Sequence, residues 1–339
     1  MPSVKDVLVD EEPDEGLGLG RFRFTDAYSV FDWGEMPDAV PQKGAALCTM
    51  GAFNFTLLEI NEVPTHYRGV VDDDGEVRSL VEVDGPPTEM AVAVARRPSL
   101  PHDEAGYDYA AYHAAAGDGY VVPLEVVFRN AVPPASSLRD RYTPREAGLD
   151  RETWPEETVD LPAPLVEFST KFETQDRYLD REEAAKVAGE ADLDLIERLA
   201  TAVNHVLTDR AEDRGLTHLD GKIEVLYDDG AIRVADVAGT FDENRYTYRG
   251  QPISKEVLRR YHRQHQSAWV EAVTQAKAAA REAGETDWRA RCERSPEPLP
   301  DRVVQTASDL YTAGVDAYTD DEWFGGPTLD EAVAAVDEL

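Results

Sequence analysis

Short runs rich in β-branched and aromatic residues alternate with turn-forming segments over the first 130 residues. These runs predict strands at 4–9, 21–25, 66–71, 77–83, 90–95 and 123–128. Asp72-Asp73-Asp74-Gly75, between two of the runs, is typical of a hairpin turn. One mostly apolar segment, 45–58, predicts a helix. This part of the chain is therefore expected to form an antiparallel sheet with one helix against it.

The second half is predicted to be mainly helical, with one hairpin. Apolar residues recur at helical spacing over 195–207, and Gly215 stands where that helix should end. The hairpin consists of strands at 222–227 and 232–236 around Asp228-Asp229-Gly230. Ser254 is a plausible N-cap for helices that run to about Gly284, and a proline-rich break at 296–300 precedes two short helices.

Two segments lack periodicity. Residues 97–119 are predicted to form an inserted surface loop, and residues 131–162 are rich in turns. Together with the strands and helices, they predict an α+β protein. An antiparallel-sheet lobe is expected over 1–95, a larger mixed α/β lobe over 96–256, and a C-terminal helical extension packed on the second lobe over 257–339.

The chain is strongly acidic. Its 339 residues include 34 basic and 68 acidic side chains, a formal net charge of −34. This charge excludes a nucleic-acid partner held by phosphate contacts and an anionic membrane surface. No apolar run of membrane-spanning length and no signal peptide is visible, so we expect a soluble cytoplasmic protein. The two cysteines cannot form a disulfide framework.

The acidic residues are spread evenly along the chain, and lysine occurs only seven times. Such a surface suits a cytoplasm of molar salt, where the Debye length is about 3 Å and self-repulsion is screened. We therefore predict a halophilic protein. An ordinary acidic protein from a low-salt cytoplasm is the alternative.

The hairpin at 222–236 is the most informative candidate site. A strand that carries Glu224 and a partner strand that ends in Asp236 would place two carboxylates side by side across the ladder. Paired carboxylates suit Mg²⁺, which commonly binds one or two of them together with nucleotide phosphates. Two solvated acids are the alternative. The following loop carries Asp242 and Arg245, an acceptor and a bidentate anion clamp.

Other candidates lie at strand ends. Arg129, followed by Ser136 and Ser137, could grip a phosphate. Lys5, Lys171 and Lys222 stand out because compact ammonium groups on β-segments are rare in this chain. The glycine-rich run 16–20 precedes a strand, so it fits neither a Walker nor a dinucleotide loop; a turn over a nucleotide and a plain flexible turn both stay open. No nucleophile motif is present.

In order along the chain, seven segments resemble motifs of the SAICAR synthetase (phosphoribosylaminoimidazole-succinocarboxamide synthase) family. Their order and spacing make the resemblance specific. The segments, with the family motifs in parentheses, are Ser3-Val4-Lys5-Asp6-Val7 (GKxKxVY), 26–32 with Lys43-Gly44 (DxxSAFD and KG), 123–130 with Ser137-Leu138 (PxExVxRN and GSL), 164–171 with Asp176 (PxxExxxK and a later Asp), 219–224 (DxKxE), 236–245 (DExSPDxxR) and 254–256 (SKQ).

This resemblance implies a kinase-like or ATP-grasp-like pair of lobes with ATP in the cleft between them. It implies a carbon–nitrogen ligase of purine biosynthesis that joins carboxyaminoimidazole ribotide (CAIR) to L-aspartate through an acyl phosphate, with ATP and Mg²⁺ as cofactors. The implied site residues are Lys5 and Lys171 on ATP, Glu224 and Asp236 on Mg²⁺ and ATP, and Arg129, Ser136, Ser137, Lys222, Asp242 and Arg245 on the substrates, with Lys5, Lys171 and Asp236 catalytic.

The sequence departs from the family pattern at several points. Ser3 replaces the first lysine of the opening motif, and Val237 replaces an acid beside the expected metal site. The loop from Asp242 to Arg245 and the turn at 135–137 differ in length from the family motifs. A small-molecule kinase on the same scaffold is the alternative function, and a non-enzymatic acidic binding protein is a further one. The sequence leaves open whether the chain forms a homo-oligomer.

Overall fold

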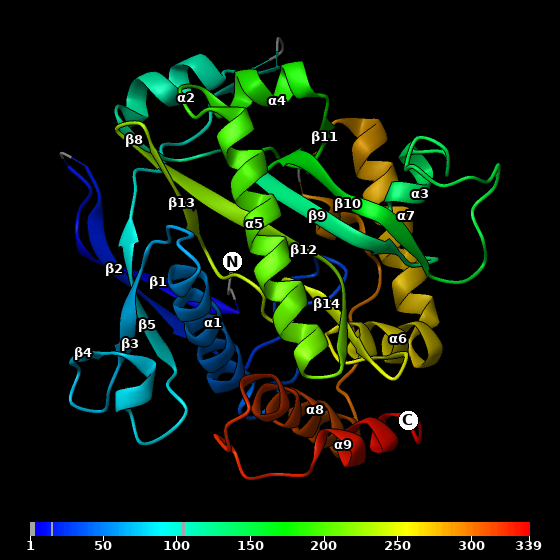
Figure 1. Ribbon diagram of the computed structural model, residues 1–339. Helices are drawn as coiled ribbons and strands as arrows, with labels where there is room; N and C mark the ends of the chain where they lie inside the picture. Colours follow the sequence, from blue (N-terminus) through cyan, green and yellow to red (C-terminus); the bar gives the residue numbers. More distant parts are fainter. Residues whose placement is uncertain (1–3, 15, 104–105, 286) are drawn as a thin grey trace.

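The computed structural model describes residues 4–14, 16–103, 106–285 and 287–339, and Ser3 lies outside these ranges. It has an α+β fold with two main antiparallel sheets (Figure 1). The first sheet has the strand order β1-β2-β5-β3-β4. Its strands are β1 (Lys5–Glu11), β2 (Gly18–Phe24), β3 (Tyr67–Val71), β4 (Val77–Arg78) and β5 (Glu89–Val94).

Alternation along β2 explains which face of the first sheet is buried. Phe22 and Phe24 point into the core, while Arg21 and Arg23 point outward and pair with Glu89 of β5. Helix α1 (Lys43–Ile60) packs against this sheet and is buried on most sides because α5 and α8 cover it elsewhere. An all-round apolar segment such as 45–58 is typical of a helix in this position.

The second sheet carries most of the site. Its strand order is β11-β10-β9-β12-β14-β15, and β8 and β13 also pair with β12. The strands are β8 (Gly119–Val121), β9 (Leu124–Val132), β10 (Val159–Thr170), β11 (Tyr178–Leu179), β12 (Leu216–Asp228), β13 (Ala231–Ala235), β14 (Arg245–Tyr248) and β15 (Gln251–Pro252). Helices α4 (Arg181–Ala188) and α5 (Leu193–Asp213) cover one face, with α5 lying across β9 and β12 in Figure 1.

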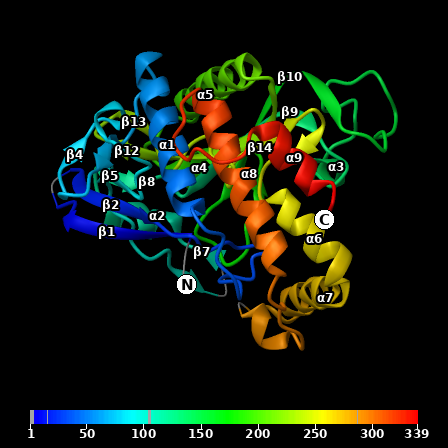
Figure 2. The same cartoon turned by 90° about the horizontal axis from the view of Figure 1, so that it is seen from below.

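The C-terminal part is helical. It comprises α6 (Glu256–His265), α7 (Ser267–Ala283), the 3₁₀ helix η2 (Trp288–Arg291), α8 (Asp301–Thr319) and α9 (Leu329–Val336). Figure 2 shows α8 lying beside α1, and the two helices are in contact. In the described residues, no helix combines the length and apolar character needed to cross a membrane.

Several predicted elements are confirmed. The strands at 66–71 and 90–95, the central helix of the first half, the helix over 195–207 and the hairpin at 222–236 are present. Gly215 follows α5 with a positive φ of 70°, the conformation expected at a helix end. The mixed α+β class is therefore correct.

Other predictions are wrong in detail. Of the predicted strand 77–83, Val77 and Arg78 form strand β4. Beyond them, Glu82 accepts a hydrogen bond from the Ser79 backbone N–H at 3.0 Å, and the 3₁₀ helix η1 (Leu80–Glu82) forms instead. The insertion 97–119 is not a plain loop: it contains α2 (Tyr109–Ala116) and the short strands β6 (His102–Asp103) and β7 (Gly106–Tyr107).

The C-terminal helices and the glycine-rich run also differ from expectation. Of the two helices predicted after the proline-rich break, α8 is long, with 19 residues. The late helices begin at Glu256, with Lys255 and not Ser254 at the N-cap. Gly18 and Gly20 lie inside β2, where an added Cβ would come within 2.1 Å and 2.6 Å of backbone oxygens of β1. These glycines thus allow close strand pairing.

Candidate active site

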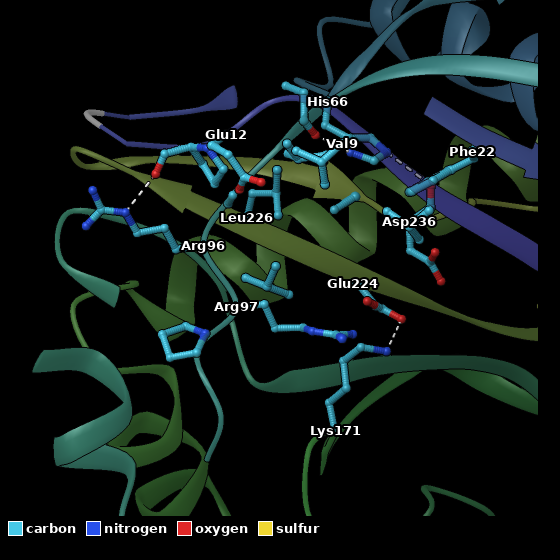
Figure 3. A pocket seen from close by; sticks show the side chains of 18 of the residues that line it. Val9, Glu12, Phe22, His66, Arg96, Arg97, Lys171, Glu224, Leu226 and Asp236 are labelled. Atoms are coloured by element: carbon cyan, nitrogen blue, oxygen red, sulfur yellow. Dashed lines mark hydrogen bonds and ion pairs between the residues drawn. The ribbon is translucent and has the colours of Figure 1, made fainter. Parts of the chain in front are cut away.

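A cavity of about 820 Å³ lies between the two sheets (Figure 3). The first sheet contributes Lys5, Val7 and Val9 from β1, and the second contributes Glu224 and Leu226 from β12. Val7 is 57% exposed and Val9 is 48% exposed. Exposed valines on a cavity wall offer an apolar surface that a flat ligand could cover. The cavity therefore combines an apolar end with a charged one.

Two ion pairs form the charged end. The Lys5 ammonium donates to the Asp236 carboxylate, and the Lys171 ammonium donates to the Glu224 carboxylate. The first pair connects β1 of one sheet with the end of β13 in the other. Figure 3 shows Glu224 bonded to Lys171, with Asp236 nearby. The structure thus brings together the four residues to which the sequence assigned ATP and Mg²⁺ contacts.

The backbone of the hairpin places the two acids. Glu224 pairs with Ala235 in the β12–β13 ladder, and Asp236 follows directly with a positive φ of 61°. Aspartate tolerates this left-handed conformation better than most residues. The His66 ring lies 3.1 Å from the Asp236 carbonyl oxygen. The Asp236 carboxylate lines the first cavity at this point.

Mutual electrostatics set the protonation of the acids. Burial and the nearby Asp236 carboxylate raise the pKa of Glu224 to about 7. Burial opposes ionisation of Asp236 too, but Lys5 and Lys171 outweigh it and lower the pKa of Asp236 below its ordinary value. Two buried carboxylates that repel each other form a site that a cation would stabilise.

A second cavity, of about 360 Å³, lies further along β12. Asp220 and Lys222 line it, and Glu224 and Leu226 line the first cavity. Alternate residues of a strand point to the same side, so these four side chains follow one face of β12 over about 20 Å. Ile223 and Val225 on the opposite face are buried in the core. One strand therefore forms a common wall for both cavities.

The second cavity contains several predicted substrate contacts. Arg129, Ser137, Lys222, Asp242 and Arg245 line it. Ser136 is buried and is absent from the described lining; its hydroxyl accepts from the Leu138 N–H at 3.4 Å.

Two arginines in this cavity converge on one carboxylate. Arg245 forms a fork on Asp220, with Nε–Oδ1 at 2.7 Å and Nη2–Oδ2 at 2.5 Å. Arg129 donates to Asp220 at 3.2 Å, to Glu167 at 2.6 Å and to the Tyr178 hydroxyl at 3.0 Å. The guanidinium of Arg129 is therefore fixed by its neighbours. The residue as a whole is 3% exposed.

Asp242 has two buried partners. Lys43, which is fully buried at the start of α1, donates to it at 2.7 Å, and the Tyr311 hydroxyl of α8 donates at 2.6 Å. Burial opposes ionisation of Asp242, but Lys43 and the more distant Lys255 lower its pKa to about 2. Asp242 thus connects its own loop to α1 and α8 at the wall of the second cavity.

Sequence reasoning missed two acids of the site. Glu125 accepts from Lys222 at 2.6 Å, and Glu243 lies 3.3 Å from the same ammonium. Burial opposes ionisation of Glu243, but Lys222 and Lys255 outweigh it and lower the pKa of Glu243. Glu243 also interacts with Asp236, so it supplies a carboxylate near the position where Val237 removes one. Glu125 lies in the segment 123–130 and Glu243 in the segment 236–245. Their position in these motifs was the signal that could have identified them as site residues.

The insertion 97–119 contacts the loop that follows Lys171. The Tyr107 hydroxyl is 2.7 Å from Thr174 Oγ1, and the Tyr109 hydroxyl donates to Glu173 at 2.8 Å. Asp176 lies in this loop, and burial together with Glu125 raises its pKa to about 6. The insertion therefore supports one side of the first cavity.

The chain shares its two-lobed α+β fold with solved synthetases, and its class is that of their ligase family. The chain is a member of the SAICAR synthetase family, whose sequence pattern matches residues 12–276.

Relatives from archaea align over nearly the whole chain. An Archaeoglobus fulgidus protein, provisionally named phosphoribosylaminoimidazole-succinocarboxamide synthase, is 39% identical over 100% of this chain and 99% of its own length. The synthase of that name from Thermoplasma acidophilum is 28% identical, covering 94% of this chain and 97% of its own length.

Solved structures share the fold. The SAICAR synthase of Saccharomyces cerevisiae, solved with SAICAR, superposes with a TM-score of 0.64 at 19% identity, covering 96% of this chain and 95% of the yeast chain. A SAICAR synthetase solved with ADP superposes with a TM-score of 0.55 at 23% identity, covering 88% of this chain and 99% of that one.

Proposed function

We propose that this chain joins CAIR and L-aspartate in an ATP-dependent reaction that releases ADP and phosphate. One observation carries the proposal: an ion-paired cavity with an apolar end shares the β12 wall with a second, arginine-lined cavity. Family membership and the names of the relatives support it. So do the related proteins solved with SAICAR and with ADP.

The reaction needs an activated carboxylate, because a free carboxylate resists attack by an amine. Transfer of the terminal phosphoryl group of ATP to the CAIR carboxylate forms an acyl phosphate and ADP. The aspartate amine then forms the new C–N bond, phosphate leaves, and the nitrogen loses a proton. The site must hold the three reactants in line and offset the charge that develops.

The first cavity suits the nucleotide. The apolar residues Val7, Val9 and Leu226 would cover the base, and Lys5 and Lys171 would neutralise phosphate oxygens. Glu224 and Asp236 offer the hard oxygen donors that Mg²⁺ prefers. The described residues contain no cluster of three or more metal-binding side chains, which fits a metal bound by two carboxylates and phosphates. When bound, the metal would neutralise the transferring phosphoryl group.

The second cavity suits the ribotide. Arg129 and Arg245 are held in place through Asp220, and Ser137 adds a hydroxyl. We propose that these groups bind CAIR with its carboxylate toward Lys222 and the shared wall. Because Asp242 is enclosed by Lys43 and Tyr311, we propose that it orients the loop that carries Arg245.

ADP release tests the proposal. The purified protein is assayed with ATP and Mg²⁺ while CAIR and L-aspartate are supplied together, singly or not at all. Release that requires both substrates, with SAICAR as product, is the expected result. A small-molecule kinase would not require aspartate, and a binding protein would release no ADP; either result would contradict the proposed reaction.

A further inference from the structure

The insertion 97–119 begins at the wall of the first cavity, although none of the reaction roles proposed above falls on it. Its first residue, Arg97, lines this cavity together with Lys171 and Glu224. In Figure 3 the Arg97 side chain extends toward Lys171 and Glu224. The insertion therefore brings an arginine to the charged end of the cavity.

The Arg97 guanidinium has donors available for a ligand. Arg97 is exposed, and along the described ranges its side chain makes neither a hydrogen bond nor an ion pair. It lies over the Phe172 ring, with Arg97 Cζ 5.7 Å from the ring centroid. A guanidinium over an aromatic face keeps its N–H donors available, because they lie in its own plane.

Neighbouring contacts hold Arg97 in this place. The carbonyl oxygen of Arg96 accepts from the Val121 N–H at 3.0 Å, so the start of the insertion is tied to its end. The Phe172 ring also packs against Tyr112 of α2, with ring centroids 5.8 Å apart. Both the backbone before Arg97 and the ring beside its side chain are therefore fixed. Such preorganisation reduces the entropy that is lost when a ligand binds.

The charges of the cavity favour an anion next to Arg97. The ion pairs of Lys5 with Asp236 and of Lys171 with Glu224 balance two ammonium groups against two carboxylates. A complex of Mg²⁺ with a nucleoside triphosphate is still an anion, and these balanced pairs do not offset its charge. Arg97 adds a cation that no carboxylate of the described residues pairs with.

The Phe172 ring brings Arg97 close to a second cation. Lys171 Nζ lies 5.9 Å from the centroid of this ring, which Arg97 also contacts. Two cations near one ring repel each other, and an anion bound between them would remove that repulsion. Phosphate oxygens suit the position, because the planar guanidinium can donate to two of them at once.

We infer that Arg97 binds phosphate oxygens of the nucleotide beside Lys171 and that the insertion thereby raises the affinity for the nucleotide. This assignment rests on the proposed function. Tyr107 and Tyr109 of the insertion already bond Thr174 and Glu173 of the loop after Lys171. A nucleotide that contacts both Arg97 and Lys171 would strengthen this connection between the insertion and the loop.

Binding of ADP with Mg²⁺, and of adenosine, tests the inference by calorimetry in Arg97→Gln and in the charge-retaining Arg97→Lys. Arg68→Gln is the matched control, because Arg68 is exposed on β3 and lines neither cavity. Loss of a charge-assisted hydrogen bond should raise the Kd for ADP about tenfold in Arg97→Gln. Arg97→Lys should recover part of this loss, and the control should change the Kd less than about threefold. Unchanged adenosine binding would show that the variant site is still folded.

The same measurements separate this inference from the proposed function. ADP binding that Arg97→Gln weakens, in a protein without ligase turnover, would support the role of Arg97 and contradict the ligase reaction. Turnover with an unchanged Kd for ADP in Arg97→Gln, or an equal loss of affinity for ADP and for adenosine, would overturn the role of Arg97. Absence of both nucleotide binding and turnover in the unsubstituted protein would overturn both.

Discussion

Removing Lys43 should destabilise the fold far more than removing an exposed lysine. Lys43 is fully buried, and its ammonium lies 2.7 Å from Asp242, whose side chain is 6% exposed. Lys43→Met leaves the largely buried Asp242 carboxylate with the Tyr311 hydroxyl as its close hydrogen-bond donor among the described residues. Breaking a buried pair by removing one partner costs about 3–5 kcal/mol. That is a large share of a typical stability of about 5–15 kcal/mol.

The free energy of unfolding, measured by urea titration at several salt concentrations, checks this magnitude. Lys186→Met is the control, because Lys186 forms an exposed pair with Glu182 whose loss should cost less than about 1 kcal/mol. The double variant Lys43→Met/Asp242→Asn removes the stranded charge and should recover about 2 kcal/mol or more. A loss below about 1 kcal/mol for Lys43→Met, or one that vanishes as salt rises, would refute the reasoning because buried pairs are screened little.

Four further outcomes are expected. Asp236→Asn should abolish turnover while the protein still folds at high salt, and near-normal turnover would argue against metal binding there. Arg245→Lys should raise the KM for CAIR about tenfold, since a point charge cannot reproduce the fork on Asp220; an unchanged KM would place the contact elsewhere. Burial lowers the pKa of His218 to about 4, so its contribution to stability, present above its unfolded pKa of about 6.5, should be lost as pH falls from 6.5 to 4. His218→Gln should reduce the slope of that part of the pH–stability curve, to which His66 also contributes because burial lowers its pKa to about 4. The melting temperature should fall as salt is removed, and full stability without salt would contradict a halophilic protein.

Local pattern was sufficient where a site residue belongs to a regular strand. The strand-like runs 222–227 and 232–236 and the turn at 228–230 predicted the hairpin, in which Glu224 pairs with Ala235, directly before Asp236. The convergence of Lys5 and Lys171 on this hairpin depends on pairing between distant segments, so its signal was the ordered set of motifs.

Other features have no local signal. The contact among Lys43, Asp242 and Tyr311 joins α1, a loop and α8, and charge pairs across such separations leave no periodic trace. Gly314 lies inside α8, although a glycine in a sequence suggests a break in a helix. It is accommodated there because an added Cβ would come within 2.7 Å of the Phe241 ring. Helix α2 is short and contains mainly alanine and tyrosine, so it lacks a polar face to mark it.

The ion pairs of the cleft affect which ligands can bind in it. Lys5 and Asp236, like Lys171 and Glu224, neutralise each other directly. A triphosphate that bound both ammonium groups would leave two buried carboxylates unpaired. A divalent cation that bound alone would leave two ammonium groups unpaired. Exchange of the ion-pair partners is favourable only when the triphosphate and the divalent cation bind together. The cleft is therefore expected to admit the metal–nucleotide complex and to discriminate against free ATP and against free Mg²⁺.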